Sequence, residues 1–213
     1  MDAEEAGGSD DIRIKAQIDE RTGETLFMVD RPLLEGMSFV CGDRDTAYGC
    51  APLAGALFDS GGVASVTIHN TNLTVARDGA GMETDEEFAV RIGGEIRAHL
   101  KTGMPVVLPE VLNNIPSDDE IRTSLQRVID EEINPGIASH SGVITLNRVE
   151  GNTAYITMGG GCQGCAASTI TLRSGIEGAF RAQVPLLGAI LDETDHAAGT
   201  NPYFKTLPAG MGG

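Results

Sequence analysis

The chain has 213 residues and carries 31 acidic against 15 basic side chains, which gives a formal net charge of −16 at pH 7. Nucleic-acid backbones and anionic membranes both bind through basic surface, so this charge argues against either as a partner. Hydrophobic residues make up 41% of the sequence but aromatic residues only 4%, so we expect aliphatic cores in one or two domains.

The first half of the chain predicts a compact α+β domain at residues 12–103, preceded by a disordered acidic tail at 1–11. Alternation of apolar and polar residues indicates the strands. Thr84 to Glu87 is a capping-box sequence, and the helix that it begins ends at Gly103. The expected elements are strands at 12–18 and 25–29, a helix at 51–59, strands at 63–68 and 73–76, and a helix from Thr84 with Phe88, Ile92, Ile96 and Leu100 on one face.

Residues 104–116 contain three prolines and are expected to form a linker. A second capping-box sequence at Ser117 then begins a helix with an apolar stripe, which we expect Pro135 to stop. The second domain, at 117–196, is predicted as helix, hairpin, helix and strand, followed by a flexible tail at 197–213. Its expected elements are that helix, a hairpin at 143–149 and 153–158, a helix at 166–183 and a strand at 189–191.

The run Gly159-Gly160-Gly161-Cys162-Gln163-Gly164-Cys165 follows the second hairpin strand. A C-x-x-C turn lets both sulfurs face one point, and a helix N-terminus there favours the thiolate form that soft metals and iron–sulfur clusters bind. Because glycine has no Cβ, Gly160, Gly161 and Gly164 let the backbone approach such a cluster closely. The motif therefore predicts a metal site with Cys162 and Cys165 as ligands.

This loop offers two thiolates, whereas a cubane 4Fe–4S cluster and a tetrahedral zinc site each need about four ligands. No other C-x-x-C is present to supply the rest. A two-fold dimer that brings two loops together would supply four thiolates, so we expect metal-dependent homodimerisation.

The motifs of residues 117–204 resemble, in order and spacing, the C-terminal domain of Nfu-type (NifU-like) iron–sulfur cluster scaffolds. Residues 12–103 are similar to the Nfu N-terminal domain. The first likeness is carried by Ile133-Asn134-Pro135, His140, Gly142, Gly159–Cys165, Thr171-Leu172, Gly175-Ile176-Glu177, Pro185 and Asp195-His196. The second is carried by Pro52-Leu53-Ala54, Leu57-Phe58, Gly62-Val63, Ser65-Val66 and Thr74-Val75.

The resemblance implies a scaffold or carrier, and not an enzyme. It would hold a labile 4Fe–4S cluster between two subunits, with Cys162 and Cys165 at the ligand positions. It would receive the cluster from donor scaffolds and transfer it to recipient apo-proteins. Two other readings of the cysteine pair stay open: a thiol–disulfide oxidoreductase and a zinc-stapled structural dimer.

The remaining candidate residues are expected to be structural. Cys41 and Cys50 are interpreted as small buried or half-buried thiols outside the cluster motif. His140 is expected to cap or hydrogen-bond a turn, and His69 and His99 are expected at the surface.

A cytoplasmic location is the expectation from the remaining sequence signals. The first ten residues are acidic and small, unlike a signal peptide or an Arg-rich transit sequence. No apolar run approaches the length of about 18 residues that a membrane helix needs. In the cytoplasm the four cysteines would be thiols or ligands rather than structural disulfides.

Overall fold

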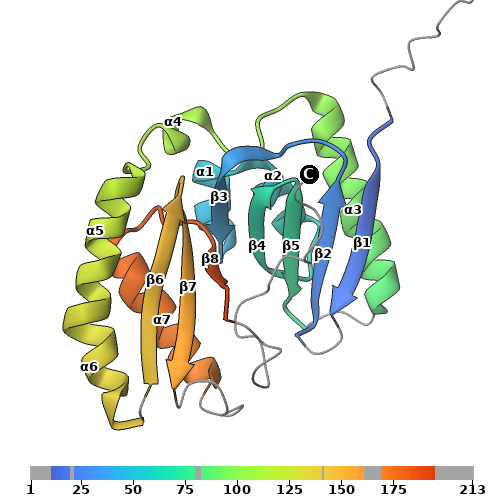
Figure 1. Ribbon diagram of the computed structural model, residues 1–213. Coiled ribbons are helices and arrows are strands. Elements are labelled where there is room, and N and C mark those ends of the chain that lie inside the picture. The colour runs from blue at the N-terminus through green and yellow to red at the C-terminus, as the bar shows by residue number, and fades with distance from the viewer. Residues whose placement is uncertain (1–10, 20–21, 80–82, 141, 161–168, 195–213) are drawn as a thin grey trace, which may run out of the picture. The chain divides into compact units, whose positions relative to one another are not determined.

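The computed structural model describes residues 11–19, 22–79, 83–140, 142–160 and 169–194 (Figure 1). The described chain is a mixture of helices and strands, as the α+β prediction requires. Its contacts divide it into two compact units: the first contains Met1–Glu35 and Val40–Leu112, and the second contains Gly36–Phe39 and Asn113–Gly213.

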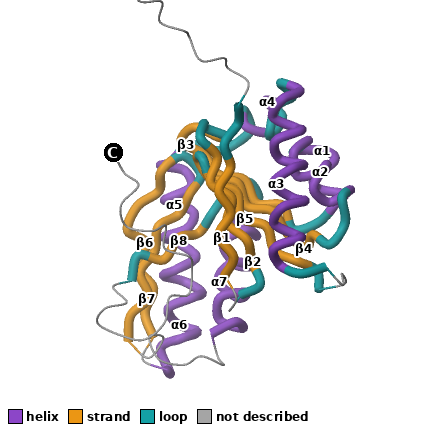
Figure 2. The backbone as a smooth tube through the Cα atoms, turned by 90° about the vertical axis from the view of Figure 1, so that its right-hand side faces the viewer, coloured by secondary structure: helices purple, strands orange, loops and turns teal. Residues whose placement is uncertain are grey.

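A five-stranded sheet with strand order β1-β2-β5-β4-β3 forms the centre of the first unit. Figure 2 shows helices α2 and α3 together on one side of this sheet, and each helix contacts a strand. Its elements in chain order are β1 (Ile14–Asp19), β2 (Glu24–Val29), β3 (Leu34–Cys41), α1 (Arg44–Cys50), α2 (Pro52–Asp59), β4 (Val63–Asn70), β5 (Asn72–Arg77), α3 (Asp85–Thr102) and α4 (Pro109–Leu112).

Helix α3 forms because its sequence supplies a cap, an apolar face and a stop. The Glu87 amide donates to Thr84 Oγ1 at 3.2 Å while the Thr84 amide donates to the Glu87 carboxylate at 2.8 Å, which completes the predicted capping box. Phe88, Ile92 and Ile96 are fully buried, as their spacing predicts. Gly103 ends the helix in the left-handed conformation, at φ +70°.

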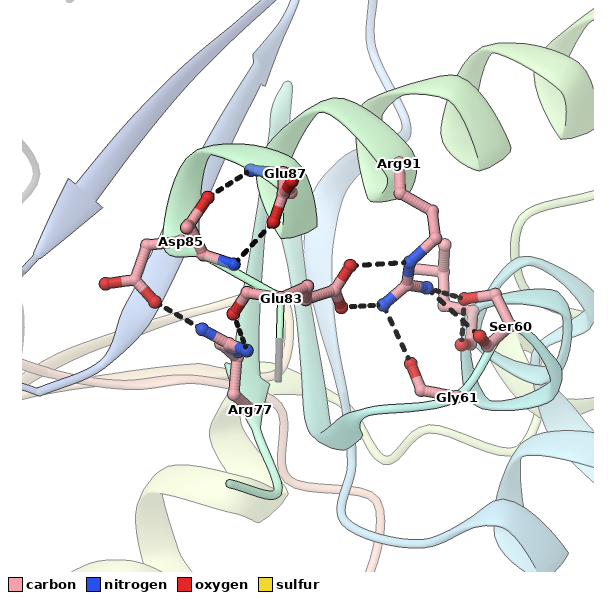
Figure 3. Close-up of polar contacts among 9 residues, drawn as sticks. Ser60, Gly61, Arg77, Glu83, Asp85, Glu87 and Arg91 are labelled. Carbon is pink, nitrogen blue, oxygen red and sulfur yellow. Dashed lines mark hydrogen bonds and ion pairs between the residues drawn. The ribbon is translucent and has the colours of Figure 1, made fainter. Parts of the chain in front are cut away.

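An arginine and a glutamate fix the start of α3 to the rest of the first unit (Figure 3). The Arg91 guanidinium pairs with the Glu83 carboxylate and also donates to Ser60 and to the Gly61 carbonyl, near the end of α2. Arg77, at the end of β5, donates to the Glu83 carbonyl and pairs with Asp85. These ion pairs and hydrogen bonds hold α3 against α2 and β5, and this structural role explains why the charged residues are there.

Two elements of this unit were not predicted, and part of the segment predicted as a linker has structure of its own. Strand β3 and helix α1 are absent from the predicted ββ-α-ββ-α order. Part of the predicted linker is packed: it forms α4, Val107 is buried, and the Leu108 amide donates to the Cys50 carbonyl at 2.8 Å.

The second unit has a three-stranded sheet in the order β6-β7-β8. Strands β6 and β7 are antiparallel, whereas β7 and β8 are parallel and are connected through α7. The elements are α5 (Asp118–Val128), a π-helical turn (Ile129–Ile133), α6 (Asn134–Ile137), a 3₁₀ turn (Ala138–His140), β6 (Gly142–Glu150), β7 (Thr153–Gly160), α7 (Thr169–Gln183) and β8 (Ile190–Asp192).

Helices pack against one face of this sheet, and no described helix of the second unit covers the opposite face, which we call the open face. Residues of β6 alternate between buried and exposed along the strand. The buried face forms one aliphatic cluster with the stripe of α5, which includes Ile121, Leu125 and Ile129, and with Ile176 and Phe180 of α7. Figure 1 shows α5, α6 and α7 on the same side of β6 and β7.

Pro135 does not stop the helix, contrary to the prediction. The helix passes through the π-helical turn, where the Asn134 amide donates to the Ile129 carbonyl, five residues earlier. Pro135 then lies in the first turn of α6, a position that requires no amide hydrogen and favours the fixed φ of proline. The wider turn therefore restarts the helix at a point where proline is tolerated.

Candidate functional site

The cysteine motif follows the carboxyl end of β7. Strand β7 ends at Gly160, which pairs with Gly142 of β6, and α7 begins at Thr169. Cys162, Cys165, Gly161 and Gly164 lie outside the described residues. Of the predicted site residues, Gly160 is thus the one whose backbone is described, and the metal-ligand assignment stays a prediction.

The segment between β7 and α7, which contains the cysteine motif, begins at an edge of the sheet where proteins of this kind of topology commonly bind ligands. Because β7 and β8 are parallel, their carboxyl ends share one edge, and the chain leaves that edge to reach the amino end of α7. In sheets with parallel strands, ligands bind outside the carboxyl ends, where helix N-termini favour negative charge. An anionic thiolate cluster suits this environment.

The strand that leads into the motif is packed tightly on its β6 side. A Cβ added at Gly159 would lie 2.9 Å from Cγ1 of Val143, its partner in β6. Glycine at position 159 therefore avoids a close contact with the Val143 side chain near the sheet edge, before any contact with a cluster is considered.

A buried polar group holds the other side of β7. The Met158 amide donates to Thr194 Oγ1 at 2.9 Å, just beyond the last residue of β8. Oδ1 of Asp192 accepts the Thr194 amide at 2.8 Å and also the Thr194 hydroxyl. Both side chains are buried, with Asp192 1% exposed. Among the described residues, Asp192 Oδ2 has no hydrogen-bond partner.

The open face of the sheet carries a charged cluster centred on Arg148. Its guanidinium stacks on the Tyr155 ring, 3.6 Å from the centroid, and pairs with Glu150 and Glu193. The hydrogen bond that Arg148 donates to Glu193 raises the pKa of Arg148. Partial burial raises the pKa of Glu193, but hydrogen bonds from Arg148 and Asn147 outweigh it and lower that pKa overall. Arg148 thus stays charged and forms ion pairs with two carboxylates.

Cys41 and Cys50 behave as the sequence predicts, as small thiols. Cys41 is completely buried and Cys50 half-buried. Burial is the main cause that raises the pKa of Cys41 to about 11, although a hydrogen bond with the backbone of Asp43 opposes it. A thiol with such a pKa is a poor metal ligand and a poor nucleophile at neutral pH.

The histidines do not form a metal site within the described part of the chain. His140 is the last residue of the 3₁₀ turn before β6. His99 was expected at the surface, and this is wrong: it is 8% exposed and its Nε2 lies 3.2 Å from the Pro105 carbonyl. In the described ranges, no three His, Cys, Asp or Glu side chains are grouped so that they could hold a metal ion.

The helices of the described ranges include none with both the length and the apolar character needed to cross a membrane.

Asp192 and Thr194 were not among the predicted site residues. The available signal was local: an Asp followed two residues later by a Thr, a spacing at which the Asp side chain accepts the later backbone amide. Asn134 was noted as part of the Ile-Asn-Pro motif without a structural reason. The structure supplies one, because its side chain hydrogen-bonds the backbone of Ile144 in β6.

Residues 125–190 match the model of the NifU-like domain family. The chain is 41% identical over 93 residues to the Fe/S biogenesis protein NfuA of Acinetobacter baylyi, covering 41% of this chain and 44% of that protein. It is 38% identical over 115 residues to the protein of the same name from Stutzerimonas stutzeri, covering 54% and 56%. A third protein of this name, from Teredinibacter turnerae, is 37% identical over 98 residues, covering 46% and 48%.

The chain thus spans about half the length of the curated relatives that it matches. The matched family segment includes β6, β7, the cysteine motif and α7. Residues 125–190 therefore match the NifU-like domain, and the comparisons confirm the predicted resemblance to Nfu-type scaffold or carrier proteins for this part of the chain.

Proposed function

We propose that this protein is an iron–sulfur cluster carrier of the cytoplasm and not an enzyme. Its cargo is a labile 4Fe–4S cluster, held by Cys162 and Cys165 of one chain and the same two residues of a second copy. Gly160, Gly161 and Gly164 give the backbone room to approach the cluster. The carrier receives its cluster from donor scaffolds and transfers it to recipient apo-proteins.

The observation that carries this proposal is the NifU-like match over residues 125–190, which includes the whole glycine and cysteine run. The relatives that the chain matches are named for Fe/S biogenesis. The position of the motif after a parallel strand supports the same chemistry, because negative charge is favoured at that edge of the sheet.

Counting ligands supports a shared site. A 4Fe–4S cluster needs about four cysteine thiolates. Cys41 is excluded as a third ligand by its complete burial and raised pKa. Two copies of the motif satisfy the count, so cluster binding and dimerisation are expected to occur together.

Transfer is favoured by an incomplete site. A cluster that is held by two thiolates from each of two chains can be released by stepwise exchange with the thiols of a recipient protein. The first unit contains no second C-x-x-C, and we assign it to recognition of donors or recipients. The net charge of −16 favours partners with basic surfaces.

Anaerobic reconstitution with iron and sulfide tests the proposal directly. We expect a brown protein with thiolate-to-iron absorption, about two iron and two sulfide per chain, and a dimer that dissociates when the cluster is removed. A colourless dimer with about half a zinc per chain would instead indicate a structural site. Reduction of protein disulfides without cluster binding would indicate a thiol–disulfide oxidoreductase.

Cysteine variants test the ligand assignment. Cys162→Ser and Cys165→Ser are each expected to abolish cluster binding and dimerisation. Cys41→Ser and Cys50→Ser are the matched controls and should retain both. Retention of the cluster in Cys162→Ser, or its loss in both controls, would show that the ligand set is wrong.

A further inference from the structure

Within the described residues, β7 is held on its β8 side by a backbone bond and then by a side chain. The backbone bond runs from the Glu193 amide to the Ile156 carbonyl, at 2.8 Å. Two residues further along β7, the Met158 amide donates to the Thr194 hydroxyl. Beyond Met158, the described pairing of Gly159 and Gly160 is with β6 alone.

The Thr194 hydroxyl has one proton and two acceptors within reach. One is the Asp192 carboxylate, which it contacts closely, and the other is the Met158 carbonyl at 3.4 Å. A hydroxyl that donates to one acceptor keeps its lone pairs for an incoming donor. When the hydroxyl proton points to Asp192, a lone pair is left for the Met158 amide. When the proton turns toward Met158, it lies on the side from which that amide approaches, and the bond from the amide is weakened.

The negative charge of Asp192 decides this competition. A hydrogen bond to a carboxylate is about twice as strong as one to a neutral acceptor. An asparagine at position 192 would have the same shape and could accept the same two bonds, but as a neutral acceptor it would hold the hydroxyl proton less firmly.

Stability alone does not explain a carboxylate at this position. Asp192 is 1% exposed, and among the described residues its Oδ2 has no hydrogen-bond partner. Burying an unpaired charged oxygen costs free energy. An amide would bury an uncharged group there at a lower cost, so we look for a role of the carboxylate beyond stability.

We propose that Asp192 and Thr194 are positioning residues for the cysteine motif. Asp192 orients the Thr194 hydroxyl, and Thr194 fixes Met158, four residues before Cys162, so that the pair sets how firmly the chain is held where it enters the motif. This inference rests on the proposed function, because it assigns the pair a role in retaining the cluster.

Four variants of the full-length protein test it. Asp192→Asn removes the charge and keeps the shape, and Thr194→Val removes the hydroxyl. Thr194→Ser restores the hydroxyl in a smaller side chain. Thr157→Val is the matched control: Thr157 also lies on β7, but its hydroxyl accepts a bond from the exposed Asn147 on the open face.

The first measurement is hydrogen exchange of the Met158 amide in the cluster-free protein. Thr194→Val is expected to speed exchange about tenfold, the change that follows from loss of one hydrogen bond, and Asp192→Asn severalfold. Thr194→Ser and Thr157→Val should stay within about twofold of the parent. Equal exchange in Asp192→Asn and Thr157→Val would overturn the orienting role of Asp192.

The second measurement is the rate at which the reconstituted cluster is lost to an iron chelator. Asp192→Asn and Thr194→Val are expected to lose it several times faster than Thr157→Val, while the urea midpoint of Asp192→Asn is equal to or above that of the parent. Unchanged cluster lifetimes, or lifetimes that fall only in proportion to stability, would overturn the proposal. A parent protein that binds no cluster would instead refute the proposed function, and the exchange measurement would still decide whether the pair positions β7.

Discussion

The side chain of Asn134 hydrogen-bonds both backbone polar atoms of Ile144. The Ile144 amide donates to Asn134 Oδ1 at 2.8 Å, and Asn134 Nδ2 donates to the Ile144 carbonyl at 3.1 Å. Strand β6 is at the edge of its sheet, so the amide group of Asn134 takes the place of a neighbouring strand. This explains why an asparagine directly precedes Pro135 in the Ile-Asn-Pro motif.

Replacing Asn134 by alanine is expected to destabilise the second unit by about 1–3 kcal/mol, because two partly buried backbone groups lose their partner. Urea unfolding, combined with amide exchange in β6 to assign the transition to this unit, measures the effect. Asn147→Ala is the matched control. Asn147 is exposed on the same strand and bonds only side chains in the described contacts, Thr157 and Glu193, so its loss should cost about 0.5 kcal/mol or less. Equal costs would show that the Asn134 bonds are not specially stabilising.

Much of the fold could be predicted from sequence where a periodic pattern agrees with a cap. The stripes Phe88–Ile96 and Ile121–Ile133 are buried as their spacing indicates, and both capping-box sequences begin helices. The hairpin strands β6 and β7 are found within about two residues of the predicted ranges.

The elements that were missed lack such a pattern. Strand β3 contains Gly36 at φ +66° and does not alternate strictly between apolar and polar residues. Helix α1 is short and has one buried residue, Ala47, so it shows no apolar stripe. Its N-cap could nevertheless have been predicted, because Asp is a preferred N-cap residue. The Asp43 side chain accepts hydrogen bonds from both the amide and the hydroxyl of Thr46.

In the candidate site, too, some residues could be predicted from the sequence and others could not. The cysteine motif is visible in the sequence because thiols and glycines at this spacing carry their chemistry directly. Asp192 and Thr194 could not be found so easily, because their role depends on the pairing of β7 with β8 and on burial. An Asp and a Thr at a strand end are otherwise typical of an ordinary turn.

Adding a methyl group at Gly159 is expected to lower the free energy of unfolding by an amount that depends on the Val143 side chain. The new Cβ would lie 2.9 Å from Val143 Cγ1, but Val143 is 45% exposed and has room to turn. We expect Gly159→Ala to cost about 0.5–1.5 kcal/mol, the energy of a strained rotamer, and Val143→Ala to relieve it. A double-mutant cycle by urea unfolding measures this coupling.

Gly175→Ala is the control for this cycle. Gly175 is an exposed residue of α7, and a Cβ there would meet no atom within 4 Å. It should therefore stabilise the helix by about 0.5–1 kcal/mol. If the cost of Gly159→Ala persists in the Val143→Ala background, the strain lies in the backbone of β7 and not in the contact with Val143.

Acid should weaken the first unit through Glu83. The hydrogen bond from Arg91, followed by the charges of Arg91 and Arg77, lowers the pKa of Glu83 below its ordinary value of 4.5. A carboxyl whose pKa is lower in the folded state stabilises the fold above its unfolded pKa and loses that contribution as pH falls through the folded pKa. The stability difference between the parent and Glu83→Gln should be full near about pH 7 and should vanish toward about pH 3.

Glu86→Gln is the matched comparison for this titration. Glu86 is exposed in the first turn of α3, so the substitution removes one negative charge near the same helix end but leaves the pair of Glu83 with Arg91 intact. Urea midpoints across the pH range should converge for Glu83→Gln and the parent, with a smaller initial gap for Glu86→Gln. The same gap and the same convergence in both variants would show that the helix dipole, and not the ion pair, is responsible.

Cys41 and Cys50 should differ strongly in reactivity toward a thiol reagent. In a variant with Cys162 and Cys165 both replaced by serine, these two are the remaining thiols of the four in the chain. Half-buried Cys50 is expected to react first. Cys41 is completely buried and its pKa is raised to about 11, so its thiolate is scarce near about pH 8 and reagent reaches it only when the unit opens.

Peptide mapping after timed labelling identifies which cysteine has reacted, and labelling in denaturing urea provides the control, because both thiols should then react at similar rates. In the folded protein the rate at Cys41 should rise in proportion when urea lowers stability below the unfolding midpoint, since opening limits the reaction. Equal rates at both cysteines without urea would contradict the buried environment of Cys41 and would reopen its exclusion as a cluster ligand.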